Sequence, residues 1–430
     1  MVAVESVRWS GFRNLSIEQR RGELIGRRGL DVDDLGVLDP EMGLTVEQAN
    51  VQVENVIGVL GVPVGLGVNF VIDGVARAIP MATEEASVVA AASNIARMTL
   101  QTGGFYTQST GPIMQAQIQL VDVVDPLSAR ARILEAQEEL VDEINAIDPV
   151  LVSLGGGCTE LSARVVDTAQ GVQVVVHIVV DVCDAMGANA VNSMAEAISG
   201  RIASLAGGRA IMRILTNLAD RRVYTARATI PATLLGGPAV VDDILAAAAL
   251  AEVDPYRAAT HNKGIMNGVS AVVLATGNDT RAVEAGAHAY AARSGRYKSL
   301  SSFERNASGD LESVLEIPMA VGLVGGATRS HPVAKANIKI LGVEKADELS
   351  RIIVALGLAQ NIAAVRALAT EGIQKGHMAL HARTVAVSAG AVGEEITRIA
   401  QAMINDGTIR SDVAERLLES MREANEVSMY

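Results

Sequence analysis

The chain has 430 residues, of which 49% are hydrophobic, 20% charged and only 3% aromatic, so it encodes two or three domains with a large aliphatic core. Its net charge of −13 excludes the basic surface that nucleic acids or anionic membranes require. Two cysteines do not imply a disulfide framework. The N-terminus lacks a signal-peptide pattern and no apolar run reaches the roughly 20 residues of a membrane helix, so we expect a cytoplasmic protein without membrane contact.

The first part of the chain predicts two helices, then a strand and a further helix. Capping-box patterns at Ser16–Gln19 and Thr45–Gln48 open the first two helices, and Val68–Ile72 is typical of a strand. Glu84 and Glu85 are expected in the first turn of the next helix, where the helix dipole favours carboxylates. Helix capping alone therefore explains this acidic pair.

Residues 111–216 have their own order of elements, which predicts an inserted small domain. Alternating apolar residues indicate strands, and apolar residues three and four apart indicate helices. The resulting order is β-α-β-β-α-β, the ferredoxin-like unit. The predicted elements are a strand at 114–123, a helix at 128–147, strands at 161–167 and 172–182, a helix at 188–205 and a strand at 209–215.

Two polar turns follow the small domain. The first, Asp254–Gly268, surrounds Lys263 with hydroxyl, amide and imidazole groups, and the second ends at Asp279. An apolar segment, Val269–Ala275, lies between them and is short enough to be a buried element. Polar turns at opposite ends of a buried element often belong to one site.

Helices are predicted at 346–356 and 359–371, and three more helical segments form a C-terminal flap. The fold class is therefore α+β, a large mixed α/β domain with an inserted ferredoxin-like domain and a helical flap. The predicted domains are 1–110 with 217–373 (large), 111–216 (small) and 374–430 (flap).

Four ionisable side chains are candidates for acid–base chemistry: Glu85, Lys263, Asp279 and His377. A lysine between carboxylates can stabilise a developing oxyanion, and a carboxylic acid or an imidazole can deliver a proton to it. Spacing along the chain does not show that these groups meet. Separate ion pairs and helix caps are the simpler explanation at this point.

The remaining histidine and cysteine positions predict no metal site. His377 and His381 are four residues apart on a predicted helix, a spacing that can bind a metal, but no third ligand accompanies them. Packing, capping and acid–base roles stay open for His377. His261 is expected to be structural. Cys158 follows three glycines as a nucleophile on a turn would, but no partner base is recognisable.

The segment Asp181–Asn189 joins a predicted strand to a predicted helix and is a candidate nucleotide site. Gly187 would let a ligand approach the backbone, and the following helix N-terminus favours phosphate. An ordinary strand-to-helix turn explains the same residues. The common dinucleotide fingerprint G-x-G-x-x-G is not found after a strand.

Five motifs, in this order along the chain, resemble hydroxymethylglutaryl-CoA (HMG-CoA) reductase. The similarity is to the soluble bacterial class II form and, most closely, to the NAD-dependent enzymes that degrade mevalonate. Each motif alone is weak, but their order is specific and covers nearly the whole chain. The motifs are Glu54–Gly58, Asp184–Asn189, Thr260–Gly264, Gly322–Thr328 and Gly376–Met378.

The resemblance implies a role for each candidate residue. The catalytic residues would be Glu85, Lys263, Asp279 and His377. The HMG end of the substrate would be held by Ser87, Arg257, Thr260 and Asn267, with Arg13 near CoA. The dinucleotide would be bound by Asp148, Asp184, Met186, Gly187 and Asn189.

The reaction implied is the interconversion of mevalonate and HMG-CoA by two hydride transfers, through mevaldehyde and a hemithioacetal. Lys263 would stabilise the oxyanion, tuned by Asp279, and Glu85 would move its proton. His377 would exchange a proton with the CoA sulfur when the flap closes. The family places its active sites at the interface of a homodimer, and a higher oligomer of dimers is possible.

Cofactor choice is expected to depend on Asp148, which matches a position where an acidic residue meets the adenosine ribose. A carboxylate repels a 2′-phosphate, so NAD is favoured over NADP, and mevalonate catabolism over biosynthesis. Two alternatives stay open: a biosynthetic NADPH-dependent reductase, and a non-catalytic protein of this fold that binds CoA thioesters. The regulatory serine of class I enzymes corresponds to Arg383, so no phosphoswitch is expected at this position.

Overall fold

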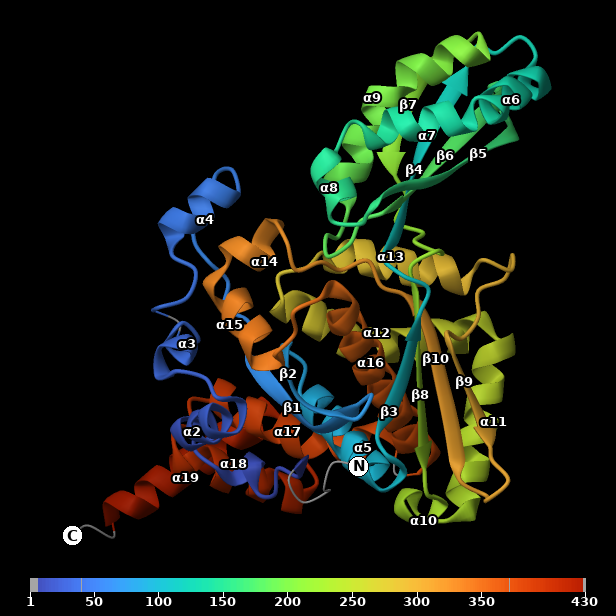
Figure 1. Ribbon diagram of the computed structural model, residues 1–430. Helices are drawn as coiled ribbons and strands as arrows, with labels where there is room; N and C mark the ends of the chain where they lie inside the picture. Colours follow the sequence, from blue (N-terminus) through green and yellow to red (C-terminus); the bar gives the residue numbers. More distant parts are fainter. Residues whose placement is uncertain (1–6, 40, 371, 428–430) are drawn as a thin grey trace.

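The structure, a computed structural model, describes residues 7–39, 41–370 and 372–427, without the side chains of residues 373–380 and 424–427. Figure 1 shows a large body, a smaller unit that projects from it, and helices at both ends of the chain. Both predicted capping boxes, at Ser16–Gln19 and Thr45–Gln48, are confirmed. The N-terminal helices are η1 (Phe12–Asn14), α2 (Ile17–Arg28), α3 (Val32–Gly36) and α4 (Val46–Gln52).

The body is built on a six-stranded sheet with the order β2-β1-β3-β8-β10-β9. β1 and β3 run parallel, and the other neighbouring strands run antiparallel. The strands are β1 (Val64–Ile72), β2 (Val75–Ala82), β3 (Phe105–Ser109), β8 (Val223–Ile230), β9 (Ser301–Arg305) and β10 (Leu311–Pro318). The helices around them are α5 (Val88–Thr99), η2 (Leu100–Thr102), α10 (Ala232–Leu235), α11 (Pro238–Val253), α12 (Pro255–Ala275), α13 (Thr280–Ala291), α14 (Gly326–Ser330), α15 (Pro332–Leu341) and α16 (Ala346–Ala369).

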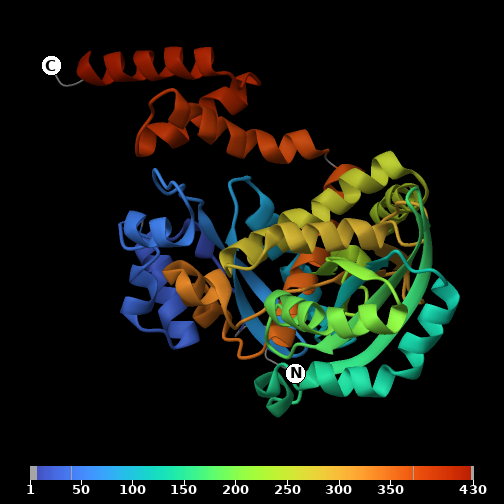
Figure 2. The same ribbon diagram turned by 90° about the horizontal axis from the view of Figure 1, so that it is seen from above.

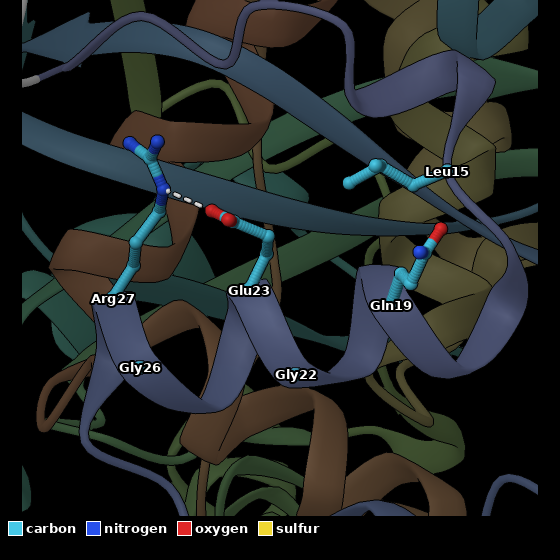
Figure 3. A pocket seen from close by; sticks show the side chains of 6 residues that line it. All are labelled: Leu15, Gln19, Gly22, Glu23, Gly26 and Arg27. Carbon is cyan, nitrogen blue, oxygen red and sulfur yellow. Dashed lines mark hydrogen bonds and ion pairs between the residues drawn. The ribbon is translucent and has the colours of Figure 1, made fainter.

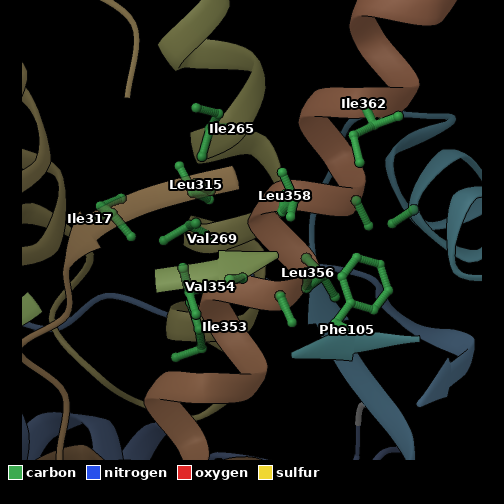
Figure 4. Close-up of a cluster of buried hydrophobic side chains, with 14 of the residues drawn as sticks. Phe105, Ile265, Val269, Leu315, Ile317, Ile353, Val354, Leu356, Leu358 and Ile362 are labelled. Carbon is green, nitrogen blue, oxygen red and sulfur yellow. The ribbon is translucent and has the colours of Figure 1, made fainter. Parts of the chain in front are cut away.

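Helix α16 is the centre of the core. It packs against α12, α5 and the strands β3, β8 and β10, and Figure 4 shows part of this apolar cluster. By length and composition α16 could cross a membrane, but 67% of its most apolar window is buried inside the protein, as in a core helix. The prediction of two separate helices, at 346–356 and 359–371, was wrong, because one helix spans Ala346–Ala369. Gly357 does not end a helix; an added Cβ would lie 2.8 Å from Val269 Cγ2, so its small size lets α16 and α12 approach closely.

The smaller unit is a four-stranded antiparallel sheet with helices packed on one face (Figure 1). Its strand order, β5-β6-β4-β7, confirms the predicted ferredoxin-like unit. Ala116, Ile118 and Leu120 are fully buried in a core of its own. The predicted helix at 128–147 is two helices, which meet at Ala136. The elements are β4 (Ile113–Val121), α6 (Pro126–Glu135), α7 (Gln137–Asn145), α8 (Pro149–Ser153), β5 (Gly157–Thr168), β6 (Gly171–Asp181), α9 (Ala188–Ala206) and β7 (Arg209–Leu215).

Three helices end the chain, as predicted: α17 (Ile373–Ser388), α18 (Glu394–Asp406) and α19 (Ser411–Val427). They pack mainly on one another, around a small core that includes Ala386, Ile399 and Met403. Figure 2 shows these helices beside the body, joined to it at the end of α16. The domain boundaries and the role of this segment as a flap stay predictions.

Candidate active site

The prediction of a polar turn around Lys263 was wrong, because the whole stretch belongs to α12, a helix of 21 residues. Asp254 caps the helix by accepting a hydrogen bond from Arg257 N at 2.7 Å. Pro255 takes the first position, where its missing N–H is not needed. The many polar residues obscured a helical period in the buried residues Ala258, Ile265, Val269 and Val272.

One face of α12 gathers the polar residues that resemble substrate contacts. They are three or four positions apart, so the helix turns them to the same side. The guanidinium of Arg257 is half-buried, burial lowers its pKa, and it has no hydrogen bond or ion pair within the described part of the chain. A partly buried cation without a partner is suited to an anionic ligand. The residues along this face are Arg257, Thr260, Lys263 and Asn267.

Lys263 forms an ion pair with Glu85. Lys263 Nζ donates to Glu85 Oε2 at 3.0 Å, although 178 positions separate the two residues in the chain. Their side chains are 62% and 37% exposed, so a ligand can reach both. Two of the four predicted catalytic groups are therefore close together.

Glu84 and Glu85 precede α5, so the prediction that they lie in its first turn was wrong. The Thr83 hydroxyl accepts a hydrogen bond from Glu85 N at 3.1 Å, and the helix begins only at Val88. Ser87, the N-cap, has a φ of +77°, and its hydroxyl is buried without a partner among the described residues. Backbone strain and an unsatisfied buried hydroxyl beside a helix N-terminus are typical of a ligand-binding position.

A pocket of about 320 Å³ opens beside this ion pair, between the segment before α5, the exposed face of α12 and the first turn of α13. In its wall Ser270 donates to Glu284 Oε1 at 2.8 Å. Glu284 and Arg281 were not predicted as site residues from the sequence. Their positions in the helical segment after Asp279 were the signal that could have indicated them. The polar lining residues are Thr83, Glu84, Glu85, Lys263, Asn267, Ser270, Thr280, Arg281 and Glu284.

Asp279 caps α13 and forms an ion pair with Arg281. Its Oδ1 accepts from the backbone N of Arg281 and Ala282 at 3.0 and 3.1 Å, and from Arg281 Nε at 3.3 Å. Partial burial acts to raise the pKa of Asp279, but these hydrogen bonds outweigh it and the pKa lies below its ordinary value. Within the described residues no hydrogen bond or ion pair joins Asp279 to Lys263.

Arg13 and His377 are not brought to this pocket by any described contact. The side chain of His377, on α17, is outside the described residues. Arg13 is exposed on η1, and its carbonyl accepts from Arg20. Figure 3 shows a separate hollow of about 530 Å³ along α2, where Glu23 and Arg27 form an ion pair at 3.0 Å. No group of metal-binding side chains occurs in the described ranges.

His261 and Cys158 have structural surroundings, as expected. His261 Nε2 lies 2.6 Å from Ser301 Oγ, and burial, with the nearby Arg257 charge, lowers the pKa of this histidine to about 4. Burial raises the pKa of the Cys158 thiol, which disfavours the nucleophilic thiolate. Asn145 holds the Cys158 backbone with hydrogen bonds of 2.7 and 3.0 Å.

The predicted dinucleotide turn lies between β6 and α9 (Figure 1). Gly187, with a φ of +103°, is the N-cap of α9 and brings no capping side chain, so the first N–H groups of that helix can bind an anion. Asn189 is exposed in the first turn. A Cβ at Gly187 would lie 2.8 Å from Val182 Cγ1, so packing also requires a glycine here, and the approach of a ligand to its backbone stays a prediction. Asp184 Oδ1 accepts from Ala346 N, at the start of α16.

The loop that follows Asp148 and α8 packs against the segment that leads into this turn. Asp148 Oδ1 caps α8 by accepting from Leu151 N at 2.9 Å, and no described hydrogen bond uses the other carboxylate oxygen. In the glycine loop that follows, a Cβ at Gly156 would lie 2.7 Å from Asp181 O and 2.8 Å from Cys183 Sγ. The loop after Asp148 is therefore in contact with the segment that leads into the dinucleotide turn.

The fold has two α+β units, one with a lysine–glutamate pair at a pocket and the other with a helix whose N-terminus has no capping side chain. Together these features indicate the class of protein, which comparison with known proteins identifies. The model of the family hydroxymethylglutaryl-coenzyme A reductase matches residues 16–382. The chain is 50% identical over 417 residues to the 3-hydroxy-3-methylglutaryl-coenzyme A reductase of Archaeoglobus fulgidus, covering 97% of this chain and 95% of that one. The chain therefore belongs to the HMG-CoA reductase family.

Solved structures show which class of HMG-CoA reductase the chain is similar to. The Streptococcus pneumoniae reductase matches with a TM-score of 0.83 and 37% identity, over 96% of this chain and 100% of that chain. The class II reductase of the same organism, bound to NADPH in open conformations, matches with a TM-score of 0.80 and 37% identity, over 95% and 100%. The predicted family and the class II assignment are confirmed.

Proposed function

We propose that this reductase uses NAD and works in the oxidative direction, converting mevalonate and CoA to HMG-CoA in mevalonate catabolism. The observation that carries the choice of NAD is Asp148, an acidic side chain at the start of α8. The loop after α8 contacts the segment that leads into the dinucleotide turn, and the second carboxylate oxygen of Asp148 has no hydrogen bond among the described residues. That oxygen can accept hydrogen bonds from ribose hydroxyls, and its charge would repel a 2′-phosphate. Asp184, Met186, Gly187 and Asn189 would line the rest of the site, with the pyrophosphate at the α9 N-terminus.

The ion pair of Lys263 and Glu85 fits the acid–base work of the reaction. A dinucleotide held at the α9 N-terminus would supply the hydride acceptor for the two stages. Lys263 would stabilise the oxyanion of the substrate at each stage, tuned by Asp279 in the assembled site. Glu85, 3.0 Å from the lysine nitrogen, would take up the hydroxyl proton. His377 would exchange a proton with the CoA sulfur as the flap, residues 374–430, closes over mevaldehyde and the hemithioacetal.

The hydroxymethylglutaryl end of the substrate would lie along α12. Arg257 would pair with the substrate carboxylate, and Thr260 and Asn267 would bind its polar groups from the same helix face. Ser87 would contribute the buried hydroxyl that lacks a partner in the described residues. Arg13 would contact CoA.

A homodimer is proposed, with active sites between the large unit of one subunit and the small unit of the other, and possibly a higher oligomer of dimers. An exposed apolar loop supports this proposal. Ile57 is fully exposed and Leu60 is 89% exposed, although burying such side chains would be favourable. Both lie in or next to the motif Glu54–Gly58.

A biosynthetic NADPH-dependent reductase is the second candidate. It is favoured by the Streptococcus pneumoniae class II structure, which was solved with NADPH bound. The two candidates share the reaction and differ in cofactor and direction.

Steady-state rates with each nucleotide, in both directions, distinguish the two candidates. We expect CoA- and mevalonate-dependent reduction of NAD to be the efficient reaction. Asp148→Ala is expected to reduce the NAD over NADP preference in kcat/KM by about tenfold or more, since about 1.4 kcal/mol of discrimination is tenfold. Asp125→Ala is the matched control, because Asp125 also caps a helix of the small unit. A strong NADPH preference of the unaltered enzyme would overturn the NAD proposal.

A further inference from the structure

Arg222 is a charged residue that is fully buried without a carboxylate partner. Its side chain is 0% exposed, and no acidic group forms an ion pair with it among the described residues. Burial lowers the pKa of Arg222, and Tyr224, together with the charges of Asp181 and Asp347, acts in the opposite direction. A buried guanidinium of this kind is unfavourable unless its N–H groups are satisfied. Its position therefore calls for an explanation.

The two terminal nitrogens of Arg222 donate to backbone carbonyls, two of which belong to the dinucleotide turn, whereas Nε is buried without a partner among the described residues. One terminal nitrogen donates to Ala185 O and Met186 O, both at 3.2 Å. The other donates to Val321 O at 2.6 Å. Arg222 itself is held at the start of β8, where its carbonyl accepts from Met319 N. The side chain thus joins the turn to the segment that follows β10.

The Gly322–Thr328 segment supports the turn from the same side. Gly322 leaves no room for a Cβ, which would collide with Met186 N. Leu323 N donates to Asp184 O at 2.9 Å, and Ala185 and Val324 form an isolated parallel bridge. The turn is therefore fixed by one buried cation and by close backbone contact.

This support continues to the end of α12. Gly322 N donates to Asn278 Oδ1 at 2.8 Å, and Asn278 directly precedes Asp279. A Cβ at Gly277 would lie 2.9 Å from Thr328 N, so the same segment packs tightly on the chain between α12 and α13. Arg222 thus stands in a continuous set of contacts from the dinucleotide turn to the elements of the pocket.

We propose that Arg222 is a positioning residue that holds the backbone of the turn 184–187 in the conformation that binds the dinucleotide. This inference rests on the proposed dinucleotide site. Three backbone carbonyls, that of Val321 buried and those of Ala185 and Met186 partly buried, share one planar cation, a geometry that the guanidinium can satisfy and a lysine ammonium cannot match. Without Arg222 the carbonyls of Ala185 and Met186 would lose this donor, and the turn would shift to expose them to water. The N-terminus of α9, which follows directly, would shift with it.

The test is to compare the KM of the dinucleotide with the KM of HMG-CoA in folded Arg222 variants. Arg222→Lys keeps the charge and Arg222→Ala leaves a cavity that free guanidinium can enter. We expect both variants to raise the dinucleotide KM by about tenfold or more, as loss of a charge-assisted hydrogen bond typically does, with the HMG-CoA KM within about twofold. Guanidinium at millimolar concentration should partly restore the dinucleotide KM of Arg222→Ala and leave the unaltered enzyme unchanged.

The neighbouring Arg221 supplies the matched control. It is partly exposed and paired with Glu160 on the surface of the small unit, so Arg221→Lys should leave both KM values unchanged. A thermal melt identifies the variants that are folded at the assay temperature. A folded Arg222→Lys with an unchanged dinucleotide KM, or an equal rise in both KM values, would overturn the positioning role. A lower melting temperature without this KM split would show a purely structural residue and would overturn it as well.

A third variant separates this inference from the proposed site itself. Asn189→Glu places a negative charge in the exposed first turn of α9 and should raise the dinucleotide KM if the pyrophosphate lies there. If Asn189→Glu has no effect, the proposed site is wrong and the inference falls with it. If Asn189→Glu weakens the dinucleotide and Arg222→Lys does not, only the positioning role is wrong.

Discussion

Lys263 is an exposed lysine on a helix, and its interest lies in what surrounds it. Glu85 reaches it from a segment that precedes α5, and Ser87, two residues further along the chain, has a strained backbone and a buried hydroxyl without a described partner. An ion pair of this kind contributes little to stability, because the lysine side chain is 62% and the glutamate side chain 37% exposed to solvent. A role in catalysis therefore explains an ion pair at the mouth of a pocket better than a contribution to folding stability does.

Removing the lysine tests this argument. Lys263→Ala is expected to lower kcat by about 10²–10³-fold, the usual loss when an oxyanion-stabilising group is removed. Stability should hardly change, for the reason given above. Steady-state kinetics at saturating substrate measure the effect, and Lys339→Ala, which removes a lysine from a surface pair with Asp34, is the control. Turnover that survives in Lys263→Ala would contradict the proposed mechanism.

His261 makes a prediction about pH. Its pKa in the folded protein is about 4, below its ordinary value of 6.5, so the unfolded chain takes up the proton first as the pH falls. The contribution of His261 to the free energy of unfolding is therefore full above about pH 6.5 and is lost toward pH 4, to a total of about 3 kcal/mol.

Urea unfolding at pH 7 and pH 5 measures this loss. His261→Gln should show a smaller difference between the two pH values than the unaltered protein. His288→Gln, at a histidine that contacts Tyr297 nearer the surface, is the control. An unchanged pH dependence in His261→Gln would assign it to other groups.

Glu85, Lys263 and Asn267 of the candidate pocket were named from the sequence, but their contacts could not be predicted. Ordered motifs pointed to Glu85 and Lys263, whereas no local pattern indicates that a chain separation of 178 positions closes to 3.0 Å. The partner of Asp279 was missed for a local reason. Arg281 is two residues away and competes for the same carboxylate at the start of α13.

Among the elements, the strands of the small unit and two capping boxes were predicted, whereas most strands of the large sheet and the continuity of the helices were not. The β-α-β-β-α-β order follows from alternation and from turn residues such as Gln170-Gly171, which are local signals. The stretch Asp254–Gly268 was mistaken for a turn because its polar residues conceal the apolar period of the helix. Lys263 and Asn267 among them line the pocket, whereas His261 and Asn262 are buried. Gly357 concealed the continuity of α16, because a glycine is required there by the approach of α12.

Glycine substitutions in two helices test that account. Gly357→Ala places a methyl group 2.8 Å from Val269 Cγ2, and overpacking of this kind is expected to lower the free energy of unfolding by about 1–3 kcal/mol. Gly200→Ala, in α9, meets no atom within 4 Å and should stabilise the protein by about 0.5–1 kcal/mol. Chemical denaturation of both variants measures the difference. Equal effects would mean that the α12–α16 contact is loose.

For the whole molecule, the exposed loop around Ile57 is the feature that a single chain does not explain. Ile57→Asp with Leu60→Asp is expected to dissociate the proposed dimer and to abolish turnover, because a charge would be buried in an apolar interface. Light scattering after size-exclusion chromatography gives the mass. Val124→Asp is the control, since Val124 is 97% exposed on the small unit. A variant that stays dimeric and active would place the interface elsewhere.

The fixed length of α12 limits which insertions the protein can accept. The exposed face of this helix carries Arg257 near one end, and the chain just beyond its other end ties to Gly322 through Asn278. A helix advances about 1.5 Å and turns about 100° with each residue, so the number of residues in α12 fixes the distance and the rotation between its two ends. One residue inserted between Thr260 and Lys263 would rotate Arg257 and Thr260 by about 100° relative to Lys263 and alter every spacing that spans the insertion. The loops of the molecule can vary in length, but this helix cannot, and an engineered insertion here should be among the least tolerated in the chain.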